Sequence, residues 1–270
     1  MNAFFIIARG LALGGAVCVL SGTVHAAAGL LIVEKSTSTG APVTNQIQIE
    51  PNRMRAETMG ARGEKQIVIF DGAKQVLTMI DEQNKSYTEL PRADADQLGT
   101  QLSDAMAQVQ KQLAALPPEQ RKQFEELMKG RMGGAGGPAA KPVYKRTGTD
   151  TVGKWSCTKY EGYEGETKTS EVCTVDPKTL GLAEGDFAVT KQFVEFFKRV
   201  VPAMASQAFA IGTPEQQGFS GIPVRRTMTV LGRQITTEIT DVSRQTFTDA
   251  SYAVPAGYQK RAFGPMGRGR

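Results

Sequence analysis

Histidine is almost absent from this sequence of 270 residues. The only one, His25, lies in an N-terminal segment that we expect to be removed. A chain without histidine has no Ser-His-Asp or Cys-His catalytic arrangement, no histidine-ligated zinc site and no histidine proton shuttle. Paired carboxylates or a serine–lysine couple would remain, but no spacing of such residues brings them together. We therefore expect a protein that is not an enzyme and that uses neither a metal nor a cofactor.

Cysteine is nearly as scarce. Cys18 lies in the N-terminal segment, which leaves Cys157 and Cys173. Two cysteines in an oxidising compartment favour a disulfide over a reactive thiol. Closing that loop would stabilise the fold by roughly 3 kcal/mol in the chain-entropy description.

The N-terminus has the features of an export signal. Arg9 supplies a weak positive charge, Gly10–Leu20 is small and apolar, and Val24-His25-Ala26 fits a cleavage site. The apolar run is shorter than the roughly 20 residues that a spanning helix needs. We expect residues 1–26 to be a signal peptide, cleaved after Ala26, and the protein to be periplasmic. An uncleaved membrane anchor is the alternative.

The sequence pI near 9.1 does not indicate a basic surface. Of the 32 basic residues, Arg9 is in the signal and four are in the last eleven positions, so residues 27–259 carry 27 basic against 27 acidic residues. A nucleic-acid-binding protein would show its positive charge on the fold itself, so we expect no nucleic-acid partner. The tail 263–270 is expected to be disordered. It is either a solvated end or a site of transient contact with acidic lipid.

Short apolar runs with a period of two predict a sheet. Gln66–Leu90 holds three such runs separated by Asp71-Gly72-Ala73-Lys74 and by the turn at Asp81–Lys85. Leu30–Lys35, Gln46–Glu50 and Arg53–Glu57 precede it. We expect about five antiparallel strands before residue 91, connected in sequence by short turns.

After Pro91 the period changes to that of a helix. Apolar residues recur from Leu98 to Leu116 and include Leu102 and Met106, and a helical insert is expected over 93–132. Such a helix either covers one face of the sheet or acts as a lid or partner-binding arm. The Gly- and Pro-rich segment 133–142 is expected to be a flexible linker, and it lacks the features of a phosphate-binding loop.

The second half repeats the pattern of strands around a helix. Gly153–Glu161 and Glu171–Val175 predict strands that place Cys157 and Cys173 opposite each other, with Trp155 on the same side as Cys157. Trp155 belongs either to the core or to a ligand platform. The helix expected over Asp186–Met204 has a broad apolar face that either fills a core or lines a cavity, and this face includes Phe193, Phe196, Phe197 and Val200. Strands resume at Pro223–Leu231 and Gln234–Val242.

Three segments resemble a family of exported bacterial proteins that carry a domain of unknown function. They are the strand–turn–strand series from Ile69 to Tyr87, the Gly153–Tyr160 segment with its aromatic residue and cysteine, and the closing Tyr252–Tyr258. The resemblance implies a fold like the lipoprotein carriers LolA and LppX, in which a curved antiparallel sheet forms an incomplete barrel. It transfers no binding residue.

We therefore expect one α+β domain over 27–262, with a curved, LolA-like antiparallel sheet and helices inserted between its N- and C-terminal strand groups. The leading hypothesis is a non-catalytic periplasmic protein that binds an apolar ligand, an acyl chain or a lipoprotein segment between sheet and helices. Candidate lining residues are Trp155, Phe193, Phe196, Phe197, Val200, Leu102 and Met106. The alternative is a cell-envelope interaction or stress module that binds a protein partner through the helical arm 93–132.

Overall fold

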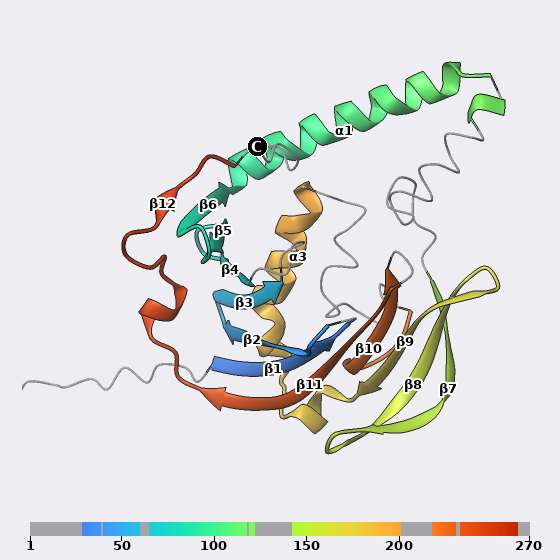
Figure 1. Ribbon diagram of the computed structural model, residues 1–270. Helices are drawn as coiled ribbons and strands as arrows, with labels where there is room; N and C mark the ends of the chain where they lie inside the picture. Colours follow the sequence, from blue (N-terminus) through green and yellow to red (C-terminus); the bar gives the residue numbers. More distant parts are fainter. Residues whose placement is uncertain are drawn as a thin grey trace, which may run out of the picture.

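The computed structural model describes residues 29–38, 40–59, 65–117, 119–121, 142–200, 218–230 and 233–263. Within them, twelve strands form one open sheet in the order β12-β6-β5-β4-β3-β2-β1-β11-β10-β9-β8-β7. Every neighbouring pair is antiparallel except β12 and β6. The sheet curves around helix α3, so that it has a concave face on the α3 side and a convex face on the other (Figure 1).

The first half of the sheet is a meander. Its strands are β1 (Gly29–Thr37), β2 (Val43–Glu50), β3 (Arg53–Met59), β4 (Lys65–Asp71), β5 (Val76–Asp81) and β6 (Ser86–Pro91). The predicted turns are confirmed, and aspartate side chains stabilise both. Asp71 Oδ1 accepts a hydrogen bond from the Lys74 amide at 2.9 Å, and Asp81 Oδ1 accepts one from the Asn84 amide at 3.0 Å. Six strands precede residue 92, one more than expected.

The second half adds strands on the other side of β1. They are β7 (Val143–Val152), β8 (Trp155–Glu164), β9 (Thr167–Val175), β10 (Ile222–Val230), β11 (Arg233–Gln245) and the short β12 (Gln259–Lys260). β1 pairs with β11 along the whole length of β1, so the N- and C-terminal strand groups form a single layer as predicted. The chain then crosses the convex face, and β12 joins β6 at the far edge.

Within the described part of the chain, the two α-helices lie at the concave side of the sheet, and three 3-10 helices accompany them in the chain. They are α1 (Arg92–Ala115), α3 (Ala188–Val200) and the 3-10 helices η1 (Pro177–Leu180), η2 (Glu184–Phe187) and η3 (Asp249–Tyr252), of which η3 belongs to the segment that crosses the convex face. The helix expected over Asp186–Met204 therefore begins as a 3-10 turn, and its residues after Val200 lie outside the described residues. The core lies between α3 and the sheet, where Phe70 of β4 and Phe196 of α3 are both fully buried.

Helix α1 meets α3 only near its N-terminal end. At Gly99 the two helices are so close that a Cβ would lie 1.9 Å from the carbonyl oxygen of Arg199, and Arg199 also forms an ion pair with Asp96 at 3.2 Å. Beyond this point α1 projects away from the sheet (Figure 1). Leu102, Met106 and Val109 are 38%, 46% and 44% exposed. Of the two alternatives for this helix, cover over the sheet does not describe these three positions.

Several predicted segments fall outside the described residues. They are the signal peptide 1–26, the linker 133–142 apart from Pro142, and the insert beyond residue 121. Of the tail 263–270 only Phe263 is described, and it packs against the core. Among the described helices, none is long and apolar enough to cross a membrane.

Candidate functional site

Four of the predicted lining residues come together on α3. The Phe70 ring lies 5.3 Å from the rings of both Phe193 and Phe196, measured between centroids, and Phe197 stacks on Phe193 at 5.9 Å. Phe193, Phe196 and Val200 are buried. This cluster packs α3 onto β3 and β4 and belongs to the main hydrophobic core.

The other three predicted residues are placed differently. Trp155, at the start of β8, is 6% exposed and belongs to the same core cluster. Leu102 and Met106 lie on the exposed part of α1. The structure therefore does not bring Leu102 and Met106 together with the phenylalanines, because α1 leaves the body after Gly99.

A second aromatic group lies on the β7–β10 side of the concave face. Phe219 is buried, and its ring lies 4.9 Å from that of Tyr144 and 6.1 Å from that of Tyr160, measured between centroids. Ser170 on β9 donates a hydrogen bond of 3.0 Å to the Tyr144 hydroxyl. Gly162 makes room for this contact, since a Cβ there would lie 2.3 Å from the Ser170 oxygen. The group combines apolar rings with hydroxyls.

Between the two aromatic groups, the concave face carries charge. Glu34 follows Leu30 and Ile32 on the same side of β1, and Arg226 on β10 is paired with Thr237 of β11, whose hydroxyl contacts Ser36 of β1 at 3.2 Å. Both charged residues thus lie on the α3 side of the sheet. A charged group in such a position costs free energy unless it is paired.

Burial shifts the pKa values of both Glu34 and Arg226. Burial raises the pKa of the Glu34 carboxyl, and the nearby Arg226 guanidinium only partly opposes that shift. Burial lowers the pKa of Arg226, against the opposing influence of Tyr144 and Glu34. Arg226 Nε is buried and has no hydrogen-bond partner within the described part of the chain. The concave face therefore offers a buried hydrogen-bond donor beside a carboxyl group whose ionisation is disfavoured.

The opposite side of the same strands holds the disulfide. Cys157 on β8 and Cys173 on β9 are bonded, with their Cα atoms 5.4 Å apart, which confirms the predicted pairing. They are 3% and 1% exposed. Because both are buried, the bond is a structural cross-link that holds β8 and β9 together.

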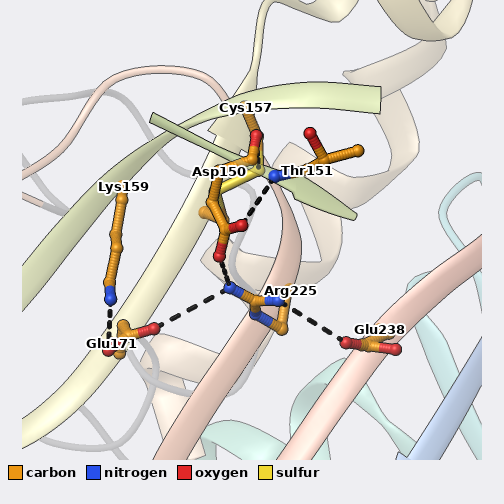
Figure 2. The surroundings of a disulfide bond; sticks show 8 residues. Asp150, Thr151, Cys157, Lys159, Glu171, Arg225 and Glu238 are labelled. Carbon is orange, nitrogen blue, oxygen red and sulfur yellow. Dashed lines mark hydrogen bonds and ion pairs between the residues drawn. A yellow bond between two sulfur atoms is a disulfide. The ribbon is translucent and has the colours of Figure 1, made fainter. Parts of the chain in front are cut away.

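A network of charges surrounds the disulfide (Figure 2). Arg225 forms ion pairs with Asp150 of β7, with Glu171 of β9 at 3.9 Å and with Glu238 of β11 at 4.0 Å. Lys159 approaches Glu171 at 3.2 Å. The hydrogen bond from Arg225 is the main reason that the pKa of Asp150 is lowered. Every carboxylate in this network faces a cation, so the network links the five strands from β7 to β11. Within the described residues, no group of three or more histidine, cysteine or acidic side chains could hold a metal ion.

The sequence contained a signal for the concave-face charges. Along β1, the period of two that places Leu30 and Ile32 in the core also places Glu34 on that side. Along β10, the buried Val224 precedes Arg226 by two positions, and Met228 follows by two. A charged residue at an inward position of a strand marks such a site, and Glu34 and Arg226 were not among the candidate residues predicted from the sequence.

This chain matches one family model, and the matched family is described without an activity. Residues 135–258 match the model of a family described as a domain of unknown function (DUF4412). The match includes the Gly153–Tyr160 and Tyr252–Tyr258 segments and leaves out the Ile69–Tyr87 series. Among solved structures, the chain is similar to an uncharacterized conserved protein from Thermus thermophilus, with 8% identity, a TM-score of 0.41, and coverage of 87% of this chain and 91% of that one. No curated protein matches.

Proposed function

We propose that this protein is a non-catalytic periplasmic carrier that binds an apolar ligand, an acyl chain or a lipoprotein segment, on the concave face of its sheet. The sheet would then act as the LolA and LppX carriers do, with a curved wall around the ligand. The observation that carries the proposal is the make-up of the β7–β11 side of that face. There the described residues present aromatic rings together with an arginine whose buried Nε atom has no hydrogen-bond partner among them.

The chemistry of that side suits an amphipathic molecule. The Tyr144, Tyr160 and Phe219 rings offer apolar area to a hydrocarbon chain. Arg226 Nε and the Glu34 carboxyl offer hydrogen bonds to a polar end. A bound polar group would satisfy the buried donor, which otherwise carries the full cost of its desolvation.

The test is uptake of a fluorescent fatty acid by the purified protein, with extraction of co-purified lipid as a second measurement. Met228→Trp adds bulk to the concave face of β10, where Met228 is 37% exposed. Thr229→Trp adds the same bulk to the convex face one residue later and is the matched control. We expect uptake to fall in the first variant only. No uptake and no bound lipid in the unmodified protein would refute the proposal.

The exposed side of α1 supports a second candidate function, binding of a cell-envelope protein. Leu102, Met106 and Val109 form a row at helical spacing and have no cover in the described part of the chain. Deleting residues 93–142 separates the two functions. The interaction hypothesis expects a folded β body that has lost its partner, and the carrier hypothesis expects exposed apolar surface and aggregation.

A further inference from the structure

The C-terminal segment crosses the convex face of the sheet, and we call residues 248–258 the strap. Arg53 of β3 fixes its start, with an ion pair to Asp249 at 2.7 Å and its guanidinium carbon 4.2 Å from the centre of the Tyr252 ring. β12 fixes its end through a hydrogen bond of 2.9 Å from the Gln259 amide to the Lys85 carbonyl oxygen. The strap is therefore held at both ends over β3 to β6.

Between the strap and the sheet lies a hollow of about 360 Å³. Its floor is formed by Ile67, Ile69 and Ile80, which make a small hydrophobic cluster of their own on the convex face. Small residues of the strap line the other side, and polar side chains of β2 and β3 line one end. The volume is within the range of small-molecule sites and equals roughly a dozen water molecules.

Some polar groups that line the hollow have ion-pair partners, and others have no partner in the described part of the chain. Arg55 and Glu57 form an ion pair at 3.1 Å, and Glu57 forms a second one with Lys65 at 3.0 Å. The Gln48 Oε1 atom is buried and has no hydrogen-bond partner within the described residues. Glu82, also in the lining, is exposed, and no other described residue forms an ion pair with it. The cations are thus neutralised, and the groups left without a partner are hydrogen-bond acceptors.

We propose that this hollow binds a small organic molecule that carries an N–H donor, an amine or an amide, on a compact hydrocarbon body. The donor would meet Gln48 Oε1, which otherwise carries the cost of an unmade buried hydrogen bond. The hydrocarbon body would pack on the three isoleucines. The site lies on the face opposite the proposed carrier site, and it does not depend on that function.

The experiment is a titration of the full protein, labelled at isoleucine methyl groups, with benzylamine, benzamide and benzoate, followed by NMR. We expect saturable shifts at Ile67, Ile69 and Ile80 with benzylamine or benzamide. Benzoate has a similar ring but no N–H donor, and it should bind about tenfold more weakly. Stronger binding of benzylamine would assign the ligand as a cation paired with Glu82, and stronger binding of benzamide would assign it as a neutral amide.

Two variants test the geometry. Gln48→Leu removes the acceptor and should weaken binding of the preferred probe about tenfold, while Gln234→Leu, an exposed glutamine on β11, should leave it unchanged. Ala253→Phe adds bulk to the strap, away from the sheet core, and should abolish binding. Isoleucine methyl groups that respond to neither N–H probe, benzoate binding of equal strength, or an unchanged affinity in Gln48→Leu would each overturn the proposal.

Discussion

The backbone of Gly99 in α1 lies against the carbonyl group of Arg199 in α3, at a distance that leaves no room for a side chain. A Cβ at position 99 would lie 1.9 Å from the Arg199 oxygen. This contact is where the long helix α1 joins the body, since the residues that follow it on α1 are exposed. The close approach at Gly99 therefore helps to set the orientation of α1, together with the Asp96–Arg199 ion pair and the buried Ala95.

Gly99→Ala should consequently destabilise the protein, although alanine is the better helix former. We expect a loss of about 1–3 kcal/mol in the free energy of unfolding, because the added methyl group must displace backbone atoms. Urea denaturation followed by circular dichroism measures it. Gln101→Ala, an exposed position on the same helix, is the control and should change stability by less than about 0.5 kcal/mol. Equal stability of the two variants would contradict the close packing.

Removal of the disulfide should weaken the fold without altering its charge network. Cys157→Ala combined with Cys173→Ala opens a loop with a sequence separation of 16, and we expect a loss of roughly 3 kcal/mol. The measurement is thermal unfolding with and without a reductant. The reductant should lower the Tm of the unmodified protein and leave that of the double variant unchanged. A double variant that still responds to reductant would show that another bond carries the effect.

Glu34 should make the protein less stable as the pH rises. Burial raises the pKa of this carboxyl above its ordinary value of 4.5 in the folded state, so the unfolded chain loses the proton first as the pH rises. Its free energy then falls relative to that of the fold, and the fold loses stability. Glu34→Gln removes this cost. We expect the variant to be the more stable protein at neutral pH and the difference to vanish below about pH 4.5, as measured by urea denaturation across that range. A variant less stable than the unmodified protein at neutral pH would contradict the burial argument.

Asp186 should show the opposite dependence. Two hydrogen bonds of 2.6 Å from Arg244 are the main reason that its pKa is lowered from the ordinary value of 3.8. The ionised carboxylate therefore stabilises the fold above that pH, and the contribution is lost as the pH falls through the lowered pKa. Asp186→Asn should cost about 1–2 kcal/mol at neutral pH, and the difference should disappear in acid. Asp176→Asn, in the preceding turn, tests whether the loss is specific to the pairing with Arg244.

The strands could be predicted from the sequence because their signal is local. Alternation along Gln46–Glu50 and the Asp turns after Phe70 and Ile80 depend only on neighbouring residues, and the structure forms strands and turns there. The disulfide followed from the cysteine count. These features need no knowledge of the rest of the chain.

The contacts between distant segments could not be predicted in the same way. The helical spacing of Leu102 and Met106 shows that α1 has an apolar side but not whether anything covers it. Glu34 and Arg226 come to the same part of the concave face only because β1 and β10 both flank β11. The order of the strands in the sheet cannot be predicted from the residues of β1 or β10 alone. The hollow beneath the strap depends likewise on where residues 248–258 cross the sheet.

The pairing of β1 with β11 also constrains how the chain is made. The side chains of Ser36 and Thr237 touch although 201 positions separate them. β1 is synthesised early, but its partner β11 is synthesised only near the end of the chain. One edge of β1 therefore stays unpaired until almost the entire polypeptide has left the ribosome. An unpaired edge is prone to join strands of other molecules, and closing so long a loop makes folding slow. We therefore expect assembly of this sheet to be a late event after synthesis, and a holding chaperone to increase its yield.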